Sequence, residues 1–315
     1  MSKKKINLEE IPGVGPKLAD KLTEMGFTDP MSIAVASPGE LSRILEIGQA
    51  TAGKIINNVR QMLKMGFTPA DKVWEQRQKM AKITTSSKSL DELLGGGIQT
   101  QAITEAFAQF GAGKTQLGFQ LSLNVQLPTE QGGLKGNTLF IDTENTFRPQ
   151  RIMQMAEAMK LDPMKALKNI FVARAFNSDH QIFLVDKASE MIENKNIKLL
   201  VVDSLTSHFR ADYMGRGELA PRQQKLNRHL HTLQRLADAH NMAIYVTNQV
   251  LSNPAVLFGD PTRPVGGHVL AHAATYRLYF RKSRGDKKIA KMLDSPDLPI
   301  GECVFQITPE GIRDV

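Results

Sequence analysis

Short apolar runs alternate with polar segments of helical period from about residue 81 onward. The runs are short and partly β-branched, which favours buried strands over helices. Amphipathic segments such as 148–160 and 222–240 separate most of them. This alternation predicts a parallel sheet covered by helices on both faces, with ligands bound at the carboxyl ends of the strands. The apolar runs read AITEAF, NTLFID, NIFVARAF, KLLVVDS and MAIYVTNQ.

Residues 1–60 carry a different pattern, in which two glycine turns each precede a segment of helical period. A Gly-Val-Gly turn leads into Pro16, and proline suits the first position of a helix. A looser copy begins at Gly48. The unit resembles a helix-hairpin-helix domain, in which turn amides, here at Gly13 and Gly15, hold a DNA phosphate. The alternative is a helical bundle that docks proteins, and the eight basic and seven acidic residues do not decide between them.

A polar connector separates this unit from the alternating region. Residues 61–80 contain the turn signal GFTPA and then a polar segment of helical period. The predicted organisation is therefore a small all-α unit at 1–60, a linker at 61–80 and an α/β core at 81–315.

The bulk composition excludes several classes of protein. The chain has 315 residues, 41% hydrophobic and 23% charged, as is ordinary for a globular protein with a sizeable core. No apolar run approaches the roughly 18 residues of a membrane span, and no apolar stretch follows the charged N-terminus. A single cysteine, Cys303, excludes an internal disulfide and a cysteine-based zinc cluster.

Basic residues are concentrated in one part of the chain. The net charge is +8, from 40 basic and 32 acidic residues. Residues 205–290 alone hold thirteen basic and five acidic residues, a surplus of eight that equals the whole net charge. Such a surplus is typical of a face that binds a polyanion, although a solvated surface is the plainer interpretation.

The segment EAFAQFGAGKTQ nearly spells a phosphate-binding loop, whose strict pattern is Gly, four residues and Gly-Lys-Ser/Thr. Ala108 stands where the first glycine belongs, but it lies at the strand exit and adds only one methyl group. Lys114 would reach the β- and γ-phosphates, and Thr115 would give its hydroxyl to Mg²⁺. We therefore expect nucleotide binding through backbone amides and side chains of Ala108, Gln109, Phe110, Gly111, Ala112, Gly113, Lys114, Thr115 and Gln116.

Polar side chains at three further predicted strand ends complete the candidate site. Asp203 ends one strand and is placed to hold the metal beside the phosphates. Another strand ends in Asp142 and Glu144, and a carboxylate there could orient or deprotonate the attacking water. The alternative for Glu144 is a helix N-terminal acid. Asn248 and Gln249 end a third strand. An amide there could sense the γ-phosphate, or could be a satisfied polar strand end.

With these motifs in place, the chain resembles the archaeal RadA recombinases of the RecA family of DNA strand-exchange ATPases. The resemblance covers essentially the whole chain. It implies a RecA-like P-loop core behind a helix-hairpin-helix domain, with ATP and Mg²⁺ as cofactors and K⁺ left open. The matching stretches include LPTEQGGLKG, DTENTFRP, VARAFNSDHQ, VVDSLTSHFRADYMGRGELAPRQQKLNRHL, TNQV, GDPTRPVGGH and GECVFQITPEGIRD.

The resemblance also implies roles in DNA and nucleotide binding. The segments HFRADYMGRGELAPRQQKL and LSNPAVLFGDPTRPVGGH are similar to the family's two DNA-binding loops. His268 would link the γ-phosphate to the second loop, and Arg148 would stack on adenine. The residues implied in DNA contact are Arg210, Arg216, Arg222, Arg263, Gly266 and Gly267.

Two segments resemble contacts between neighbouring subunits. Phe67 and Ala70 match a Phe-x-x-Ala tether, although Phe67 could instead pack on its own chain. Asp294 and Pro296 lie in DSPDLP, which resembles a cap that one subunit places over its neighbour's ATP. Two departures from the family pattern are Ala108 and the pair Ser252-Asn253, where many relatives carry an arginine before the proline.

The expected function is ATP-dependent homologous pairing and strand exchange in recombination and double-strand-break repair, by a helical filament on single-stranded DNA. The expected partners are single- and double-stranded DNA, further copies of the chain in a filament or ring, and recombination mediators, with no membrane. The expected location is the cytoplasm, in association with the nucleoid. The rivals are a ring-forming hexameric helicase or clock-type ATPase, and a mediator that barely hydrolyses ATP.

Overall fold

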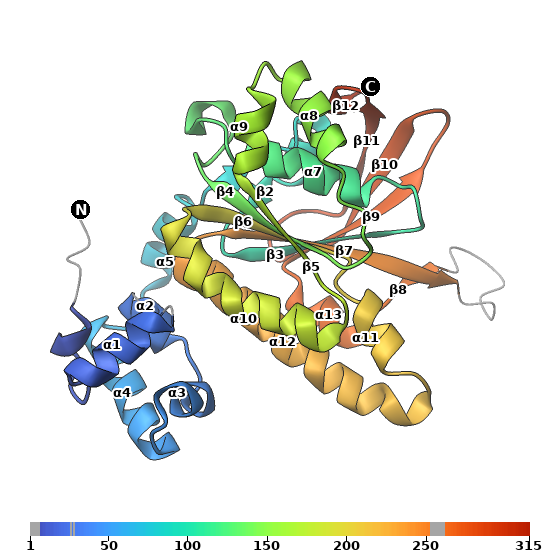
Figure 1. The fold of residues 1–315 in the computed structure, drawn as a ribbon. Helices are drawn as coiled ribbons and strands as arrows, with labels where there is room; N and C mark the ends of the chain where they lie inside the picture. The colour runs from blue at the N-terminus through green and yellow to red at the C-terminus, as the bar shows by residue number, and fades with distance from the viewer. Residues whose placement is uncertain (1–6, 26, 28, 253–261) are drawn as a thin grey trace. The chain divides into compact units, whose positions relative to one another are not determined.

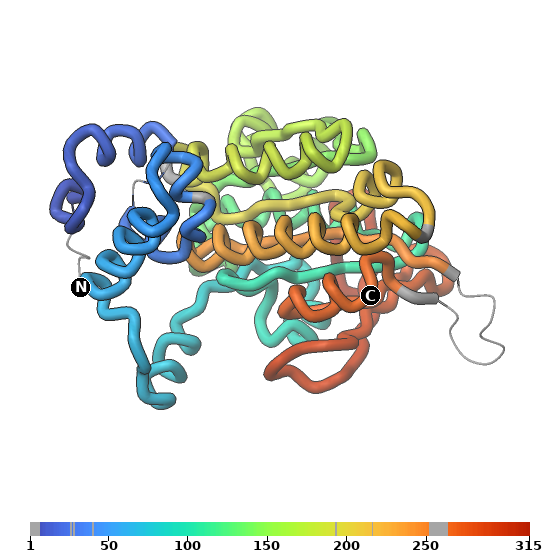
Figure 2. Tube along the Cα trace, turned by 90° about the horizontal axis from the view of Figure 1, so that it is seen from below, coloured from blue at the N-terminus to red at the C-terminus, as the bar shows by residue number. Residues whose placement is uncertain are grey.

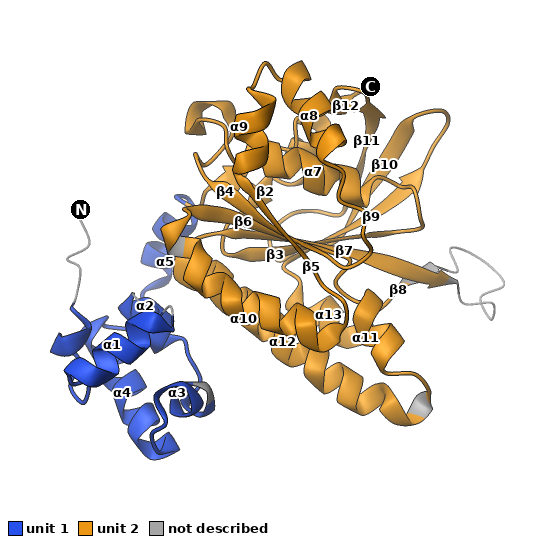
Figure 3. Ribbon diagram, viewed as in Figure 1, with its two compact units in different colours: residues 1–79 blue, residues 80–315 orange. Residues whose placement is uncertain are grey.

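The computed structural model describes residues 7–25, 27, 29–252 and 262–315. The chain divides into two compact units, residues 1–79 and 80–315 (Figure 3). Among the described residues, none of the helices combines the length and the apolar character needed to cross a membrane.

The first unit is all-helical. Its small core is built from apolar residues such as Ile11, Leu22 and Ile55, each at most 1% exposed. Gly13 has φ = +93°, a conformation that glycine adopts without strain, and Gly15 caps α1 with Pro16 at the first helical position. The elements are η1 (Leu8–Glu10), α1 (Pro16–Glu24), α2 (Pro30–Ala34), α3 (Pro38–Leu45), α4 (Gln49–Met62) and α5 (Ala70–Arg77).

The predicted boundary at residue 60 falls in the last turn of α4, and compactness groups residues 61–79 with the first unit. This segment contributes little to that unit's core, since α5 buries none of its residues.

The second unit is an α/β domain around one large sheet, with strand order β12-β11-β10-β9-β3-β7-β6-β4-β5. Strands β9 to β5 along this order are mutually parallel, whereas β10, β11 and β12 are antiparallel. A short β8 pairs antiparallel with β7, and β1 and β2 form a separate ribbon. The strands are β1 (Lys82–Ile83), β2 (Ile98–Gln99), β3 (Ala102–Ala108), β4 (Asn137–Asp142), β5 (Ile170–Arg174), β6 (Ile197–Asp203), β7 (Ala243–Ser252), β8 (Thr262–Pro264), β9 (Tyr276–Lys282), β10 (Lys287–Asp294), β11 (Gly301–Thr308) and β12 (Gly311–Asp314).

Helices cover both faces of the sheet, as predicted (Figure 1). One apolar core lies under α6 (Lys88–Leu93), α7 (Lys114–Asn124), α8 (Pro149–Ala158) and α9 (Pro163–Lys168). The other lies under α10 (Ser178–Asn194), α11 (Ser207–Asp212), α12 (Leu219–His240) and α13 (Gly267–Ala273). On this second face α10 and α12 pack against each other (Figure 2). Short 3-10 turns complete the unit as η2 (Thr129–Gln131) and η3 (Arg216–Glu218).

The five predicted apolar runs correspond to β3, β4, β5, β6 and β7, which confirms the mostly parallel α/β core. Strands β9 to β12 had no counterpart in the pattern. Strand β9 alternates buried and partly exposed positions, and its neighbour β10 carries charged side chains. One face of each strand is thus only partly covered, as is common for antiparallel sheets.

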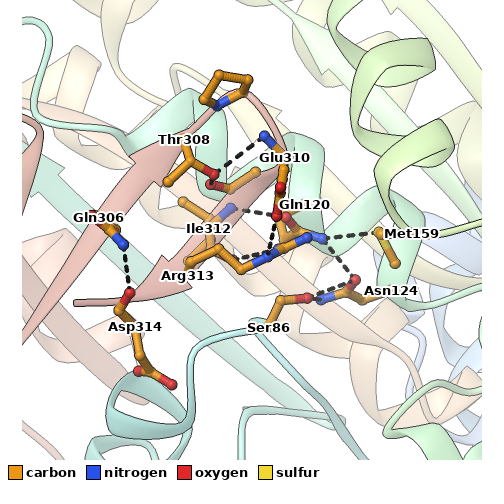
Figure 4. A network of polar contacts seen from close by, with 12 residues as sticks. Ser86, Gln120, Asn124, Met159, Gln306, Thr308, Glu310, Ile312, Arg313 and Asp314 are labelled. Carbon is orange, nitrogen blue, oxygen red and sulfur yellow. Dashed lines mark hydrogen bonds and ion pairs between the residues drawn. The ribbon is translucent and has the colours of Figure 1, made fainter.

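Buried polar side chains hold α7 in place (Figure 4). Gln120 accepts a hydrogen bond from the backbone N–H of Ile312 at 3.0 Å and donates to Asn124 at 2.9 Å. Asn124 in turn donates to the carbonyl of Thr84 at 2.6 Å. Since α7 begins directly after the glycine loop, these contacts with β12 and with residue 84 fix the orientation of the candidate site.

Candidate functional site

The glycine loop forms an anion-binding turn between β3 and α7. Gly111 and Gly113 have φ = +74° and +103°, so both need the freedom of glycine. A Cβ on Gly113 would lie 2.6 Å from Cδ1 of Ile307. Within the described parts of the chain, the backbone N–H groups of residues 111–116 have no acceptor. A turn of free N–H groups at a helix N-terminus is the arrangement that binds phosphate.

Ala108 lies outside this turn. It is the last residue of β3, is 1% exposed and pairs in register with Gln249 on one side and Phe280 on the other. Its side chain therefore packs in the sheet rather than toward the loop amides. The departure from the strict glycine pattern leaves the turn geometry intact.

We expect Ala108→Gly to change the affinity for a nucleotide by less than about tenfold, or roughly 1.4 kcal/mol. The methyl group is buried in the sheet and no loop amide depends on it. Isothermal titration calorimetry with ATP and Mg²⁺ measures this directly. A larger gain in affinity would show that the alanine had impaired the loop.

Lys114 folds over the loop. Its Nζ donates to the carbonyl oxygens of Ala108 at 3.1 Å and Gln109 at 3.2 Å. Burial lowers the pKa of this ammonium group, and the carboxylates of Asp203 and Glu144 oppose that shift. A partly desolvated lysine across a ring of free amides is suited to pair with a polyphosphate.

Asp203 and Thr115 form the centre of a candidate metal site. The Thr115 hydroxyl donates to Oδ2 of Asp203 at 2.7 Å, and the Thr247 hydroxyl donates to Oδ1. Burial raises the pKa of Asp203, while these two hydrogen bonds and Lys114 lower it. A carboxylate and a hydroxyl at the mouth of the loop are hard oxygen donors of the kind that Mg²⁺ prefers, so the residues fit that ion.

Glu144 is held at the exposed rim of the same edge. Gln249 donates from Nε2 to Oε1 of Glu144 at 2.7 Å, which joins β7 to the turn that follows β4. Asp142 shapes the turn that carries Glu144, because its carboxylate accepts from the backbone N–H groups of residues 144, 146 and 147. Partial burial of the carboxyl group raises the pKa of Glu144, as does the neighbouring Asp203 carboxylate.

The amide of Asn248, next to Gln249 in the chain, faces away from the glycine loop. Asn248 is fully buried and bonds to Glu105, Thr206 and Val265 rather than facing the loop. Asn248 is thus a satisfied polar residue within β7, which continues to Ser252 beyond the predicted strand end. Gln249 alone reaches the rim.

Three other predicted nucleotide contacts are Arg148, Gln116 and Phe110. Arg148 is exposed at the N-terminus of α8, where its guanidinium donates to the carbonyl oxygens of Asn145 and Phe147. Gln116 accepts from Nε of Arg151 at 2.8 Å. Phe110, at the apex of the loop, is 92% exposed.

The segments implied in DNA contact follow the carboxyl ends of β6 and β7, since α11 comes after β6 and β8 comes after β7. Arg210 lies on α11 and Arg222 on α12, and Arg216 lies on η3 in the segment that joins these two helices. Arg263 lies on β8. The side chains of Arg216 and Arg263 are outside what the structure describes, as is Asn253.

The second predicted DNA loop rejoins the core at a glycine pair. Gly266 and Gly267 have φ = +98° and +60°, and α13 begins at Gly267. His268 follows and stacks on His272 with 6.1 Å between the rings. The basic Lys225 of this region is engaged elsewhere, since it pairs with Asp179 at 2.6 Å.

The predicted intersubunit residues are all on the surface. Phe67 is 110% exposed, so it does not pack within its own unit, and Ala70 begins α5. Asp294 ends β10, and Asp294 and Pro296 are exposed.

Sequence reasoning missed two residues that shape the site. Thr247 and Thr146 both donate to Asp203, the latter at 3.4 Å. Asp142, predicted as a carboxylate at a strand end, instead caps the turn before α8. A signal existed for Thr247, because side chains alternate along a strand and Thr247 therefore shares a face of β7 with Gln249.

The fold and the site together define a P-loop nucleoside triphosphatase with a RecA-like core. Comparison with known proteins narrows this class. The Rad51 family model matches residues 76–315, and the SAM-like helix-hairpin-helix tandem model matches residues 6–61. One relative, the DNA repair and recombination protein RadA of Aeropyrum pernix, is 54% identical over 308 residues, or 98% of this chain and 97% of the relative. The chain belongs to the Rad51 family, which confirms the resemblance to archaeal RadA recombinases.

Proposed function

We propose that the chain is a DNA-dependent ATPase that forms helical filaments on single-stranded DNA and catalyses homologous pairing and strand exchange in recombination and repair. One observation carries the proposal. The free loop amides, the Thr115–Asp203 pair and the Glu144–Gln249 pair converge at one edge of the sheet, and β7 runs from that edge into the second predicted DNA loop. The family match and the RadA relative support the same activity.

ATP and Mg²⁺ are the proposed cofactors. The amides of residues 111–116 and Lys114 would hold the phosphates, and Arg148 would cover the adenine. Thr115 and Asp203 would hold Mg²⁺, which supplies charge neutralisation at the phosphates when bound. K⁺ remains an additional candidate ion at the same edge.

Glu144 is the proposed general base. Its carboxylate lies at the exposed rim, next to the Thr115–Asp203 pair, and Gln249 holds it by the 2.7 Å hydrogen bond. Gln249 would also report the state of the γ-phosphate to the second DNA loop, because both lie on β7 and its continuation. His268 would act with it from the start of α13.

Assembly is proposed to use Phe67 and Ala70 as a tether on one subunit and Asp294 and Pro296 as a cap over the nucleotide of the next. Gly13 and Gly15 would give the helix-hairpin-helix unit a further contact with DNA. Recombination mediators are proposed partners, and the proposed location is the cytoplasm, in association with the nucleoid.

Electron microscopy on long single-stranded DNA with an ATP analogue, paired with a strand-exchange assay, tests the proposal. Extended helical filaments and exchanged product are expected. Lys114→Ala is the matched control, and it should abolish ATP-dependent exchange because it removes the ammonium group that bonds to the loop carbonyls of Ala108 and Gln109. Closed rings without exchange would favour the helicase class, and DNA binding without ATP turnover would favour a mediator.

DNA affinity is expected to be mainly electrostatic, with each arginine that contacts a phosphate adding about one unit to the slope of log K against log salt. Arg216→Ala and Arg263→Ala should each lower that slope and leave ATP binding without DNA intact. Fluorescence anisotropy of labelled single-stranded DNA over a salt series measures it. Arg43→Ala, an arginine of the first unit, is the control. An unchanged slope in both variants would move the contact to other residues.

A further inference from the structure

A buried polar cluster lies on the face of the sheet that is remote from α7. Glu105, Asn248 and Arg277 come from β3, β7 and β9, which are adjacent in the order β9-β3-β7. Side chains alternate along a strand, so Glu105 and Asn248 share the face of Ile103 and Val246, which belong to the core under α12 and α13. Glu105 and Asn248 are 0% exposed, and the Arg277 side chain is 11% exposed.

Glu105 uses both carboxylate oxygens. Oε2 accepts from Nε of Arg277 at 2.7 Å, and Oε1 accepts from Nδ2 of Asn248 at 2.7 Å. Burial raises the pKa of Glu105, and both partners oppose that shift. A buried carboxylate held between two donors resists displacement, because movement of either donor would leave one buried carboxylate oxygen without its hydrogen bond.

Asn248 is saturated with hydrogen bonds. Nδ2 donates to Glu105 and to the carbonyl of Val265 at 2.6 Å, while Oδ1 accepts from the Thr206 hydroxyl at 2.7 Å and from the N–H of Gln249 at 2.9 Å. The orientation of the amide is determined, because a carbonyl and a carboxylate only accept hydrogen bonds. All four donor and acceptor positions of this side chain are thus satisfied.

These hydrogen bonds connect the segment that leads into the first predicted DNA loop with the segment that ends the second. Val265 immediately precedes the Gly266–Gly267 pair, and its N–H also bonds to the carbonyl of Gln249 at 3.0 Å. Thr206 precedes α11, which carries Arg210 and leads into the first loop.

The same strand contacts the nucleotide site with its other face. Thr247 donates to Asp203 and Gln249 donates to Glu144, and Asn248 lies between them on β7. Three successive residues therefore join the metal carboxylate, the roots of the DNA loops and the proposed base. A displacement of Gln249 that follows the nucleotide state must pull on Asn248, whose amide oxygen holds the Gln249 N–H.

We propose that Glu105, fixed by Arg277, is a positioning residue that locks Asn248, and that this cluster couples the nucleotide site to both DNA loops. The inference rests on the proposed function. It predicts that weakening the cluster reduces the stimulation of ATP turnover by DNA more than it reduces turnover without DNA.

Thr206→Val tests the coupling with little change in shape, since it removes only the hydroxyl that reaches Asn248. Turnover is measured without DNA and with saturating poly(dT). We expect the ratio to fall about fivefold, while DNA-free turnover stays within about twofold of wild type, as for loss of a coupling of ordinary size. Thr206→Ser keeps a hydroxyl and should restore the ratio.

Thr104→Val is the matched control. Thr104 is equally buried on β3 but lies on the opposite face, and its hydroxyl has no partner in the described structure. The ratio should stay at the wild-type value. Asn248→Leu removes all four bonds and should lower the ratio further, and if it does not fold, Thr206→Val decides alone.

A wild-type ratio in a folded Thr206→Val protein, with only its melting temperature lowered, would overturn the inference and leave the cluster a purely structural one. A parallel fall in DNA-free and DNA-stimulated turnover would overturn it as well. A wild-type protein that poly(dT) does not stimulate would instead contradict the proposed function.

Discussion

Replacing Glu144 by glutamine is expected to lower ATP turnover by about 100-fold or more while ATP and DNA still bind. Glutamine keeps the shape and can still accept the hydrogen bond from Gln249, but it cannot take a proton. Steady-state hydrolysis, calorimetric ATP binding and electron microscopy of DNA filaments give the three readouts. Glu157→Gln, an exposed acid on α8, is the matched control.

The pH profile supplies a second readout for Glu144. Partial burial and the Asp203 carboxylate raise the pKa of Glu144 above the ordinary glutamate value. A base must be deprotonated to act, so wild-type turnover should fall as the pH drops through this raised pKa and be retained above it. The glutamine variant should lack this limb. Unchanged turnover in Glu144→Gln would return the residue to a helix-terminal acid.

Replacing Phe67 by glutamate is expected to yield a folded monomer that binds ATP and forms no long filaments. The ring is fully exposed in the chain and has no packing in its own unit to lose. Burying a phenylalanine in a neighbour is worth roughly 1.5–3 kcal/mol, and a head-to-tail contact repeats that loss at every junction. Light scattering and electron microscopy with single-stranded DNA measure the assembly.

Met164→Glu is the control for this variant, because Met164 is also an exposed apolar residue, 56% exposed, on the surface of the second unit. The melting temperature of Phe67→Glu should match that of the wild type. Filaments of normal length from Phe67→Glu would refute the tether and leave the exposed ring without an assembly role.

The central strands were predictable from the sequence because buried strands consist almost entirely of apolar residues. Strands β3, β4 and β6 are short apolar runs that are buried at all or nearly all positions, whereas only Ile170 is buried in the edge strand β5. A strand covered on both faces has no solvated side to supply polar residues. Strands β9 to β12 have such a side, so charged residues such as Lys288 and Lys291 interrupt the apolar pattern and hide the strands.

In the candidate site as well, the sequence predicts some residues and only the tertiary structure places others. The glycine loop, Lys114, Thr115 and Asp203 follow from local rules, because a strand end, a glycine turn and a helix start are neighbours in the chain. The sequence could not decide between Asn248 and Gln249, since both are amides at one strand end. Alternation placed them on opposite faces, but only the packing of the two helical layers showed which face holds the nucleotide edge.

By itself, the sequence determined the class of fold, the phosphate loop and the family, because each is encoded in short contiguous patterns. The tertiary structure decided the pairings that join distant segments: Gln249 with Glu144, Thr247 with Asp203, and Asn248 with Glu105 and Val265. Such pairings depend on strand order and register, which are set by the burial of whole faces of the sheet rather than by local preference.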